Sequence, residues 1–207
     1  MNSSSASAFA GFRFPREVIS VAVRWYLRYG LSYRDVEELL AERGVDVDHV
    51  PGDRWYVDET YVKVNGRWTY LYRAVDQHGQ VIDVRLSTRR DLTAARTFFT
   101  RALATGAVPV EVTTDRAPAY PRVLDELVPI ARHDTERYAN NRVEADHDRL
   151  KARLRPMRGV KTFRSAGILA IGHAFVQNLR RGHYDIATDA PVHRRLPAAF
   201  AELALAI

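Results

Sequence analysis

The feature that most constrains the fold is a run of alternating residues that begins directly after Pro51-Gly52. From Trp55 to Val64 the chain is rich in Val, Tyr and Thr and alternates, which is typical of a strand with one buried face. Asn65-Gly66 follows, and this dipeptide between two alternating runs is the strongest short-range signal of a β-hairpin. Further strands are predicted at residues 68–75 and 81–86. The sequence therefore predicts an antiparallel meander of three strands.

After the meander the pattern changes to helices that alternate with short strands. The strand expected at 108–113 is almost entirely apolar, as in a strand buried at the centre of a sheet. The other expected elements are helices at 92–104, 118–127, 141–155 and 165–181, and a strand at 128–131. The predicted fold class is α/β: the meander is extended by two short strands, and helices cover both faces of the sheet.

The residues before Pro51 predict two short helices, at 16–29 and 32–42, separated by a glycine turn at Gly30. Such a pair is half of a helix-turn-helix, although small helical hairpins are also common without that role. The expected organisation is an N-terminal helical segment (1–50), a core (51–183) and a C-terminal tail (184–207).

Composition excludes several classes of protein. The chain has no cysteine, which excludes a disulfide scaffold, a thiol nucleophile and a thiolate metal site. It has no apolar run approaching the ~18 residues of a membrane span, and residues 1–10 do not resemble a secretory signal. We therefore expect a cytoplasmic protein with no membrane partner.

Positive charge is concentrated in one part of the chain. The net charge is +6, but residues 137–183 alone carry eleven basic and three acidic side chains. The rest of the chain is therefore slightly acidic. A basic segment of this kind favours contact with nucleic acid, although it is also compatible with a solvated helix face.

Three acidic residues stand where solvation alone does not explain them. Asp58 lies within the first strand, Asp115 closes the apolar strand, and Glu144 lies on the basic helix. If the first and fourth strands are neighbours, Asp58 and Asp115 can converge, and a helix packed across them can deliver Glu144. Oxygen ligands alone suit Mg²⁺ or Mn²⁺, and two such ions can clamp the oxygens of a phosphodiester displacement. Taken singly, however, Asp115 is equally compatible with a helix cap and Glu144 with a solvated charge.

Basic side chains around this helix are the expected DNA contacts. Lys151 is one of three lysines and follows Glu144 by seven residues, or two helical turns, so both project from the same face. The other candidates for phosphate contact are Arg116, Arg149, Arg153, Arg155, Arg158, Lys161 and Arg164. His147 is a candidate for contact with DNA or with a ligand residue. The three tryptophans, Trp25, Trp55 and Trp68, are predicted to lie in the core or in an interface, or to stack on a base.

Three short motifs together resemble a known family. They are Asp-Glu-Thr at 58–60, Thr-Thr-Asp-Arg-Ala-Pro-Ala-Tyr at 113–120 and Asn-Asn-Arg-Val-Glu-Ala-Asp-His at 140–147. In this order they resemble the signature of bacterial insertion-sequence transposases of the IS-six type. That family belongs to the DDE transposase and integrase superfamily, and the resemblance covers nearly the whole chain.

The resemblance implies an RNase H-like core in which Asp58, Asp115 and Glu144 form the catalytic, metal-binding triad, with Lys151 as a DNA contact. It implies metal-dependent DNA cleavage and 3′-hydroxyl strand transfer, with two Mg²⁺ or Mn²⁺ ions. The implied partners are the terminal inverted repeats of an element, target DNA and further copies of the chain in a homodimer or larger assembly. The expected location is the bacterial cytoplasm, at the nucleoid when DNA is bound.

Two departures from the family pattern keep alternatives open. A recognition helix and linker are expected between Val50 and Pro51, and the sequence has no residues for them. Asp148, where similar proteins often carry Gly or Arg, adds negative charge one turn from Glu144. A transposase remnant that only binds DNA, or an RNase H-like nuclease without end specificity, are the alternative functions.

Overall fold

The computed structural model describes residues 51–136, 140–154, 160–184 and 186–203. The helices predicted at 16–29 and 32–42 lie outside these residues, as does Trp25. The compact unit that contains the sheet ends at Arg181, and the described residues from Gly182 onward belong to a second unit.

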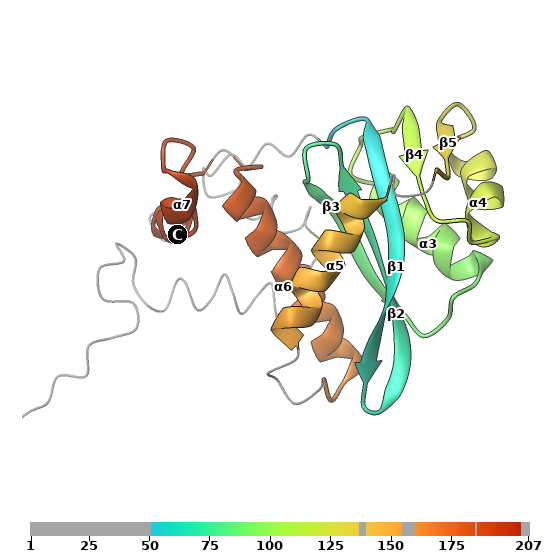
Figure 1. Cartoon of the computed structure of the whole chain (residues 1–207), viewed down its shortest axis with the longest axis horizontal. Helices are drawn as coiled ribbons and strands as arrows, with labels where there is room; N and C mark the ends of the chain where they lie inside the picture. Colours follow the sequence, from blue (N-terminus) through green and yellow to red (C-terminus); the bar gives the residue numbers. More distant parts are fainter. Residues whose placement is uncertain (1–50, 137–139, 155–159, 185, 204–207) are drawn as a thin grey trace, which may run out of the picture. The chain divides into compact units, whose positions relative to one another are not determined.

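Five strands form a single sheet with the order β3-β2-β1-β4-β5 (Figure 1). Their bounds are β1 Arg54–Val64, β2 Arg67–Asp76, β3 Val81–Ser87, β4 Glu111–Thr113 and β5 Arg132–Asp134. The first three strands are antiparallel neighbours, which confirms the predicted meander.

The turn between β1 and β2 explains why this hairpin forms. Asn65 and Gly66 both have positive φ angles, 47° and 79°. A two-residue turn with both residues in this region matches the right-handed twist of the paired strands, and Asn-Gly is the sequence that tolerates it best. The turn sets the register, so that Lys63 lies opposite Trp68.

The two short strands extend the sheet on the other side of β1. β4 runs parallel to β1, and β5 runs parallel to β4. The first and fourth strands are therefore neighbours, as the convergence of Asp58 and Asp115 requires. The parallel pairing also carries the carboxyl ends of β1 and β4 in the same direction.

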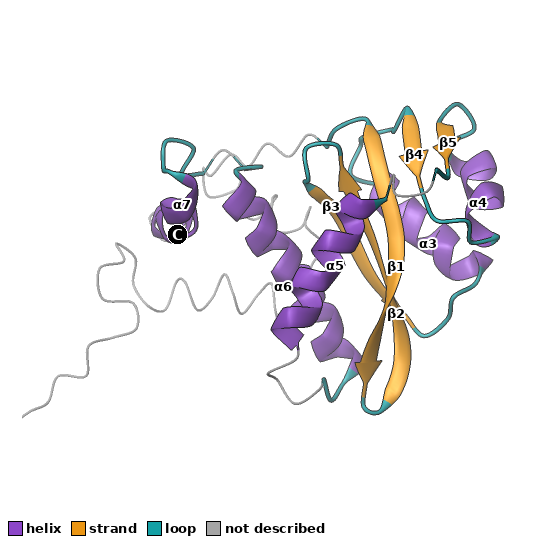
Figure 2. Cartoon of the chain, viewed as in Figure 1, coloured by secondary structure: helices purple, strands orange, loops and turns teal. Residues whose placement is uncertain are grey.

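Helices cover both faces of the sheet, as predicted (Figure 2). α3 and α4 lie against one face, and α5 and α6 lie against the other. The bounds of these helices are α3 Leu92–Leu103, α4 Ala119–Leu127, α5 Asn141–Leu154 and α6 Phe163–Arg181.

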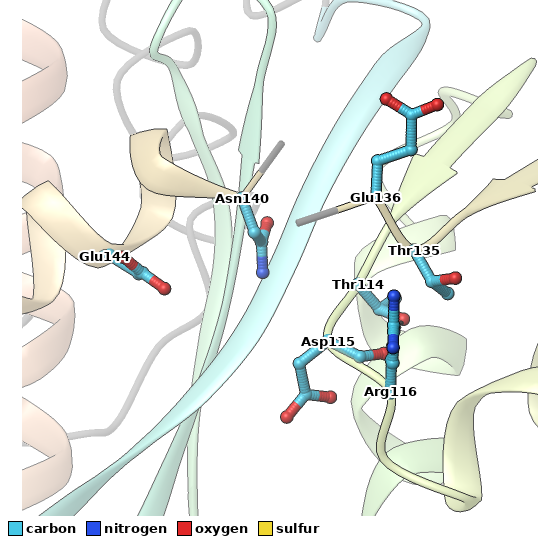
Figure 3. A pocket seen from close by; sticks show the side chains of 7 residues that line it. All are labelled: Thr114, Asp115, Arg116, Thr135, Glu136, Asn140 and Glu144. Carbon is cyan, nitrogen blue, oxygen red and sulfur yellow. Dashed lines mark hydrogen bonds between the residues drawn. The ribbon is translucent and has the colours of Figure 1, made fainter. Parts of the chain in front are cut away.

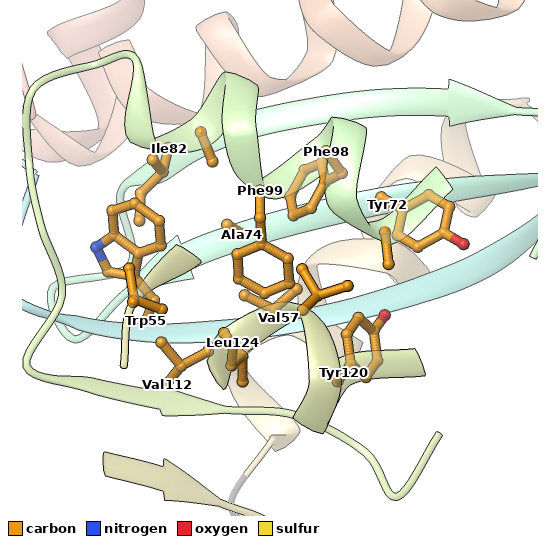
Figure 4. Packing of buried hydrophobic residues seen from close by; sticks show 14 of the residues in the cluster. Trp55, Val57, Tyr72, Ala74, Ile82, Phe98, Phe99, Val112, Tyr120 and Leu124 are labelled. Carbon is orange, nitrogen blue, oxygen red and sulfur yellow. The ribbon is translucent and has the colours of Figure 1, made fainter. Parts of the chain in front are cut away.

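The main hydrophobic core lies between the sheet and α3 with α4 (Figure 4). Trp55 is fully buried in it, which confirms one predicted core tryptophan. Phe98 stacks on Tyr72 of β2, and Phe99 meets Tyr120 of α4 edge to face. These aromatic contacts join α3 to β2, which pairs with the strand that carries Asp58, and join α4 to α3.

The predicted extents of the two short strands were wrong. β4 begins at Glu111 rather than 108, and Val108 and Val110 are exposed. The cause is the partner strand, because β1 begins at Arg54, which lies opposite Glu111. The strand predicted at 128–131 is a turn: the Val128 N–H still donates to the carbonyl of Leu124 in α4, and the strand forms only at Arg132–Asp134.

The second unit contains a helix where the sequence predicts only a tail. α7 spans Val192–Leu203 and includes Pro197, a residue that removes one helical hydrogen bond and usually marks a helix end. The Glu202 carboxylate accepts a hydrogen bond from the backbone N–H of Ala187, 2.9 Å away, and this ties the helix to the preceding loop. Among the described residues, no helix is both long and apolar enough to cross a membrane.

Candidate active site

Asp58 and Asp115 come together because of the register between two parallel strands. Trp55 lies opposite Val112 and Tyr56 lies opposite Thr113. Asp58 follows Tyr56 by two residues, and Asp115 follows Thr113 by two residues. The pairing therefore carries both carboxylates to the same level at the carboxyl edge of β4, as predicted from the sequence.

A third carboxylate, Glu59, joins them. One carboxylate oxygen from each of Asp58, Glu59 and Asp115 lies within 4.8 Å of the others. Burial, followed by the nearby charges of Glu59 and Asp115 and, more weakly, Glu144, raises the pKa of Asp58 from 3.8 to about 7. The cluster therefore concentrates negative charge that its surroundings only partly compensate.

Glu59 is not among the site residues predicted from the sequence, and it is held by two side chains from separate elements. Its carboxylate accepts hydrogen bonds from the Tyr120 hydroxyl and from Arg90 Nε. Burial raises its pKa despite these partners. The available signal was an acidic residue on the core-facing side of a buried strand, because such a charge is retained only where it is paired.

The two oxygens of Asp115 have separate roles. Oδ1 accepts a hydrogen bond from the backbone N–H of Ala117, 2.9 Å away, which stabilises the turn after β4. Oδ2 lies 3.1 Å from Arg90 Nη2, on the side of the carboxylate cluster. Asp115 therefore stabilises its turn with one oxygen and presents the other to the site.

Glu144 reaches the site from the opposite side, on the first turn of α5 (Figure 3). It lines the same open pocket of about 390 Å³ as Asp115, together with Thr114, Arg116, Thr135, Glu136 and Asn140. Glu144 is exposed and does not belong to the tight carboxylate cluster. The structure therefore brings the three predicted residues to one site, with Glu144 at its rim.

A buried contact sets the position of α5. The Asn140 side chain donates a hydrogen bond from Nδ2 to the carbonyl of Val57, 2.9 Å away. Val57 directly precedes Asp58, so the start of α5 is joined to the strand that carries the carboxylate. This contact fixes the start of α5 beside Val57 of β1, and it thereby sets the position of Glu144 relative to Asp58.

His147 packs beneath the site, one turn after Glu144. Its side chain is only 3% exposed, and its Nδ1 lies 3.6 Å from Asp58 Oδ2. Of the two roles considered for this histidine, burial favours contact with Asp58 over contact with DNA.

The predicted DNA-contact residues are distributed unevenly over the described structure. Arg116 is exposed beside Asp115 and lines the pocket, and Lys151 is half-buried on α5. Arg149, Lys161 and Arg164 are exposed. Arg155, Arg158 and the side chain of Arg153 lie outside the described part of the chain.

The residues present fit a hard divalent cation. Asp58, Glu59 and Asp115 supply only oxygen ligands, which are the donors that Mg²⁺ and Mn²⁺ prefer. The raised pKa of Asp58 indicates that a nearby cation would favour the ionised carboxylates. The expected chemistry of the site is therefore metal-dependent, as predicted from the sequence.

Comparison with known proteins identifies the family. A protein-family profile described as "DDE domain" matches residues 52–183, which include the whole sheet and all three predicted catalytic residues. The chain belongs to the DDE transposase family of insertion sequences. Its membership confirms the family predicted from the three motifs, and with it the class of DNA-cutting and strand-transfer enzymes. Nothing in the comparisons favours a remnant that only binds DNA.

Relatives of this DDE transposase include two proteins of Staphylococcus aureus. The transposase for insertion sequence-like element IS431mec is 34% identical over 198 residues, covering 81% of this chain and 88% of the relative. The transposase for insertion sequence element IS257 in transposon Tn4003 matches with the same identity and coverage.

A solved structure supports the fold. A chain of the simian T-cell lymphotropic virus intasome in complex with PP2A regulatory subunit B56 gamma is similar with a TM-score of 0.51 and 19% identity. The match covers 73% of this chain and 63% of that chain. The predicted RNase H-like α/β core is thus confirmed at the level of the fold.

Proposed function

We propose that this transposase cuts and rejoins DNA through Asp58, Asp115 and Glu144, which together hold two Mg²⁺ or Mn²⁺ ions. The observation that carries the proposal is the convergence of Asp58, within β1, and Asp115, just after the carboxyl end of β4, opposite Glu144. When bound, such ions lower the pKa of the attacking water or hydroxyl and stabilise the charge that develops on the phosphate.

The chain's own residues orient the ligand carboxylates. Arg90 contacts both Glu59 and Asp115 and so sets their separation. Tyr120 holds Glu59 from α4, and His147 contacts Asp58 from α5. Because the groups that hold these carboxylates come from different elements, the packed sheet and helices pre-organise the site.

The proposed substrates are the terminal inverted repeats of an insertion sequence and a target DNA. The exposed basic side chain of Arg116, which lines the pocket beside Asp115, matches the charge of a phosphate backbone. We propose that the protein acts as a homodimer or larger assembly on paired DNA ends, in the cytoplasm at the nucleoid. The transposase names of its relatives support this assignment.

The region before β1 bears on recognition of the DNA ends. The alignment with the IS431mec transposase is 198 residues long but covers only 81% of this 207-residue chain, so the relative carries aligned residues that this chain lacks. We propose that these residues include the recognition helix and linker expected between Val50 and Pro51. We propose that catalysis is retained and that discrimination between terminal and random DNA is reduced.

The test is metal-dependent cleavage and strand transfer on DNA from the ends of the element. The parent protein is expected to cut this DNA with Mg²⁺ or Mn²⁺ and not with EDTA. Asp115→Asn is expected to lower the rate by at least about 100-fold while DNA binding persists. Asp125→Asn, the same change on the exposed face of α4, serves as the matched control. Cleavage that survives Asp115→Asn contradicts the proposal.

A further inference from the structure

One face of the β1–β2 hairpin carries aromatic side chains that no described helix covers. Tyr61 lies opposite Tyr70 and Lys63 lies opposite Trp68, so these four side chains share one face of the sheet. Tyr72, on the same face, is buried beneath Phe98, whereas Tyr61 is 50% exposed and Trp68 is 62% exposed. This face of the sheet is therefore buried near Tyr72 and exposed toward the tip of the hairpin, beyond α3.

The exposed rings are held in a fixed arrangement. The ring centroids of Tyr61 and Trp68 are 6.2 Å apart at an interplanar angle of 84°, and those of Tyr61 and Tyr70 are 5.2 Å apart. The Lys63 ammonium lies 5.5 Å from the centroid of the Trp68 ring. We name Tyr61, Lys63, Trp68 and Tyr70 the hairpin surface. It combines aromatic faces with a positive charge.

The hairpin surface is continuous with the active site. Tyr61 follows Glu59 of the carboxylate cluster by two residues, so both lie on the same face of β1, about 7 Å apart along the strand, whereas Asp58 lies on the opposite face. Burial lowers the pKa of Arg90, but the carboxylates of Glu59 and Asp115 and, more weakly, Tyr61 raise it overall. Arg90 contacts Glu59 and Asp115 directly, and Tyr61 is near enough to act on its charge.

From this geometry we infer that the hairpin surface binds unpaired bases at the end of a DNA strand whose backbone leads to Asp58 and Asp115. The inference rests on the proposed function and specifies the form of the substrate. Inside a paired duplex the bases present only their edges, because both faces are stacked, and at a paired end only the outer face of the last pair is open. Aromatic rings beside a lysine bind bases by stacking on those faces, so the surface favours DNA whose end has opened.

The extent of the surface argues against a second copy of the chain as its occupant. Tyr61 and Trp68 each expose on the order of 100 Å². A stable protein–protein interface buries about 800 Å² on each partner. The positive charge of Lys63 and of exposed Arg67 at the turn also matches phosphate better than an identical basic surface.

The test compares two duplexes of one sequence, with paired or with mismatched terminal base pairs, bound to the full-length protein without divalent metal. The parent is expected to prefer the mismatched end, and binding is expected to quench tryptophan fluorescence. Trp68→Ala should weaken binding of the mismatched end about 5- to 100-fold and leave the paired duplex nearly unaffected. Trp68→Phe, which keeps an aromatic face, should retain most of the preference.

Ile130→Ala removes another exposed apolar side chain, 98% exposed in the turn before β5, and should change neither affinity. Circular dichroism checks that each variant is folded. The inference is overturned if Trp68→Ala binds both duplexes like the parent, if it weakens both equally, or if it dissociates a dimer. A parent that prefers open ends but fails to cleave with Mg²⁺ contradicts the proposed function alone, whereas cleavage without this preference contradicts the inference alone.

Discussion

At the scale of single residues, the site is dominated by carboxylates, and burial raises the free energy of their ionised forms. The pKa of Asp58 is raised from 3.8 to about 7 by burial and by the carboxylates around it. Between these two pH values the folded protein holds a proton that the unfolded chain has lost. The free energy of unfolding of the metal-free protein therefore falls as the pH rises from about 4 to about 7, and it stays low above that range.

Asp58→Asn is accordingly expected to abolish cleavage and yet to stabilise the metal-free protein. Above pH 7 the substitution should raise the free energy of unfolding by about 1–3 kcal/mol, because the buried negative charge is gone. Below pH 4 the two proteins should be equally stable. Thermal unfolding in EDTA across this range measures the difference. Mg²⁺ should stabilise the parent more than the variant.

Asp125→Asn, on the exposed face of α4, provides the control, because it removes a carboxylate outside the cluster and should not raise the free energy of unfolding above pH 7. If Asp58→Asn is less stable than the parent at pH 8 in EDTA, the ionised Asp58 carboxylate does not destabilise the folded protein, and the prediction is wrong.

At the scale of elements, the position of α5 decides whether Glu144 faces Asp115. Val143, His147 and Leu150 form its buried stripe, which leaves Glu144 at the rim of the pocket. The hydrogen bond from Asn140 to the Val57 carbonyl fixes the start of the helix along β1. α6 uses the same device elsewhere: Asn178 accepts from the N–H of Val81 and donates to its carbonyl.

These two asparagines allow stability to be separated from catalysis. Asn140→Ala and Asn178→Ala each remove a buried amide that bonds to a strand, so each should cost about 1–3 kcal/mol of folding free energy. Only Asn140→Ala should also lower the cleavage rate of the folded fraction, by about 10-fold or more, because it releases the helix that carries Glu144. Urea unfolding and single-turnover cleavage measure the two effects. Equal loss of activity in both variants would mean that Asn140 acts through stability alone.

At the scale of the whole molecule, positive and negative side chains are concentrated in different places, and this separation suits an enzyme that acts on DNA. Eleven of the basic residues lie in residues 137–183, while the acidic cluster lies at the strand edge that α5 faces. The basic segment can bind phosphates, and the acidic cluster can bind cations.

Lys151→Ala should therefore weaken DNA binding to a similar extent on all sequences and lower the slope of log affinity against log salt by about one. Arg132→Ala removes a positive charge from the edge strand β5, away from α5, and should leave the slope unchanged. Binding measured over a range of salt concentrations gives both slopes. The same slope for Lys151→Ala and the parent would exclude Lys151 as a phosphate contact.

Much of this protein could be predicted from local patterns. Alternation and the Asn65-Gly66 turn predicted the meander, since each depends on neighbouring residues and on backbone geometry alone. The three predicted carboxylates each interrupt or end a local pattern. Asp58 lies within a strand suited to burial, Asp115 ends an apolar strand, and Glu144 lies on a basic helix. The limits of β4 and β5 were missed because a short strand extends only as far as its neighbour does, and a single sequence does not contain that information.

The sequence by itself determined the fold class and the family, and it predicted the three carboxylates that we propose as the catalytic residues. Only the tertiary structure decided which other groups complete the site. Glu59, Arg90 and Tyr120 are far apart in the chain and meet because strands and helices pack against one another. It likewise decided that Trp55 is buried while Trp68 is exposed, although both lie on strands of one hairpin. The reason is physical: burial and pairing depend on what packs against a side chain, and that partner comes from elsewhere in the chain.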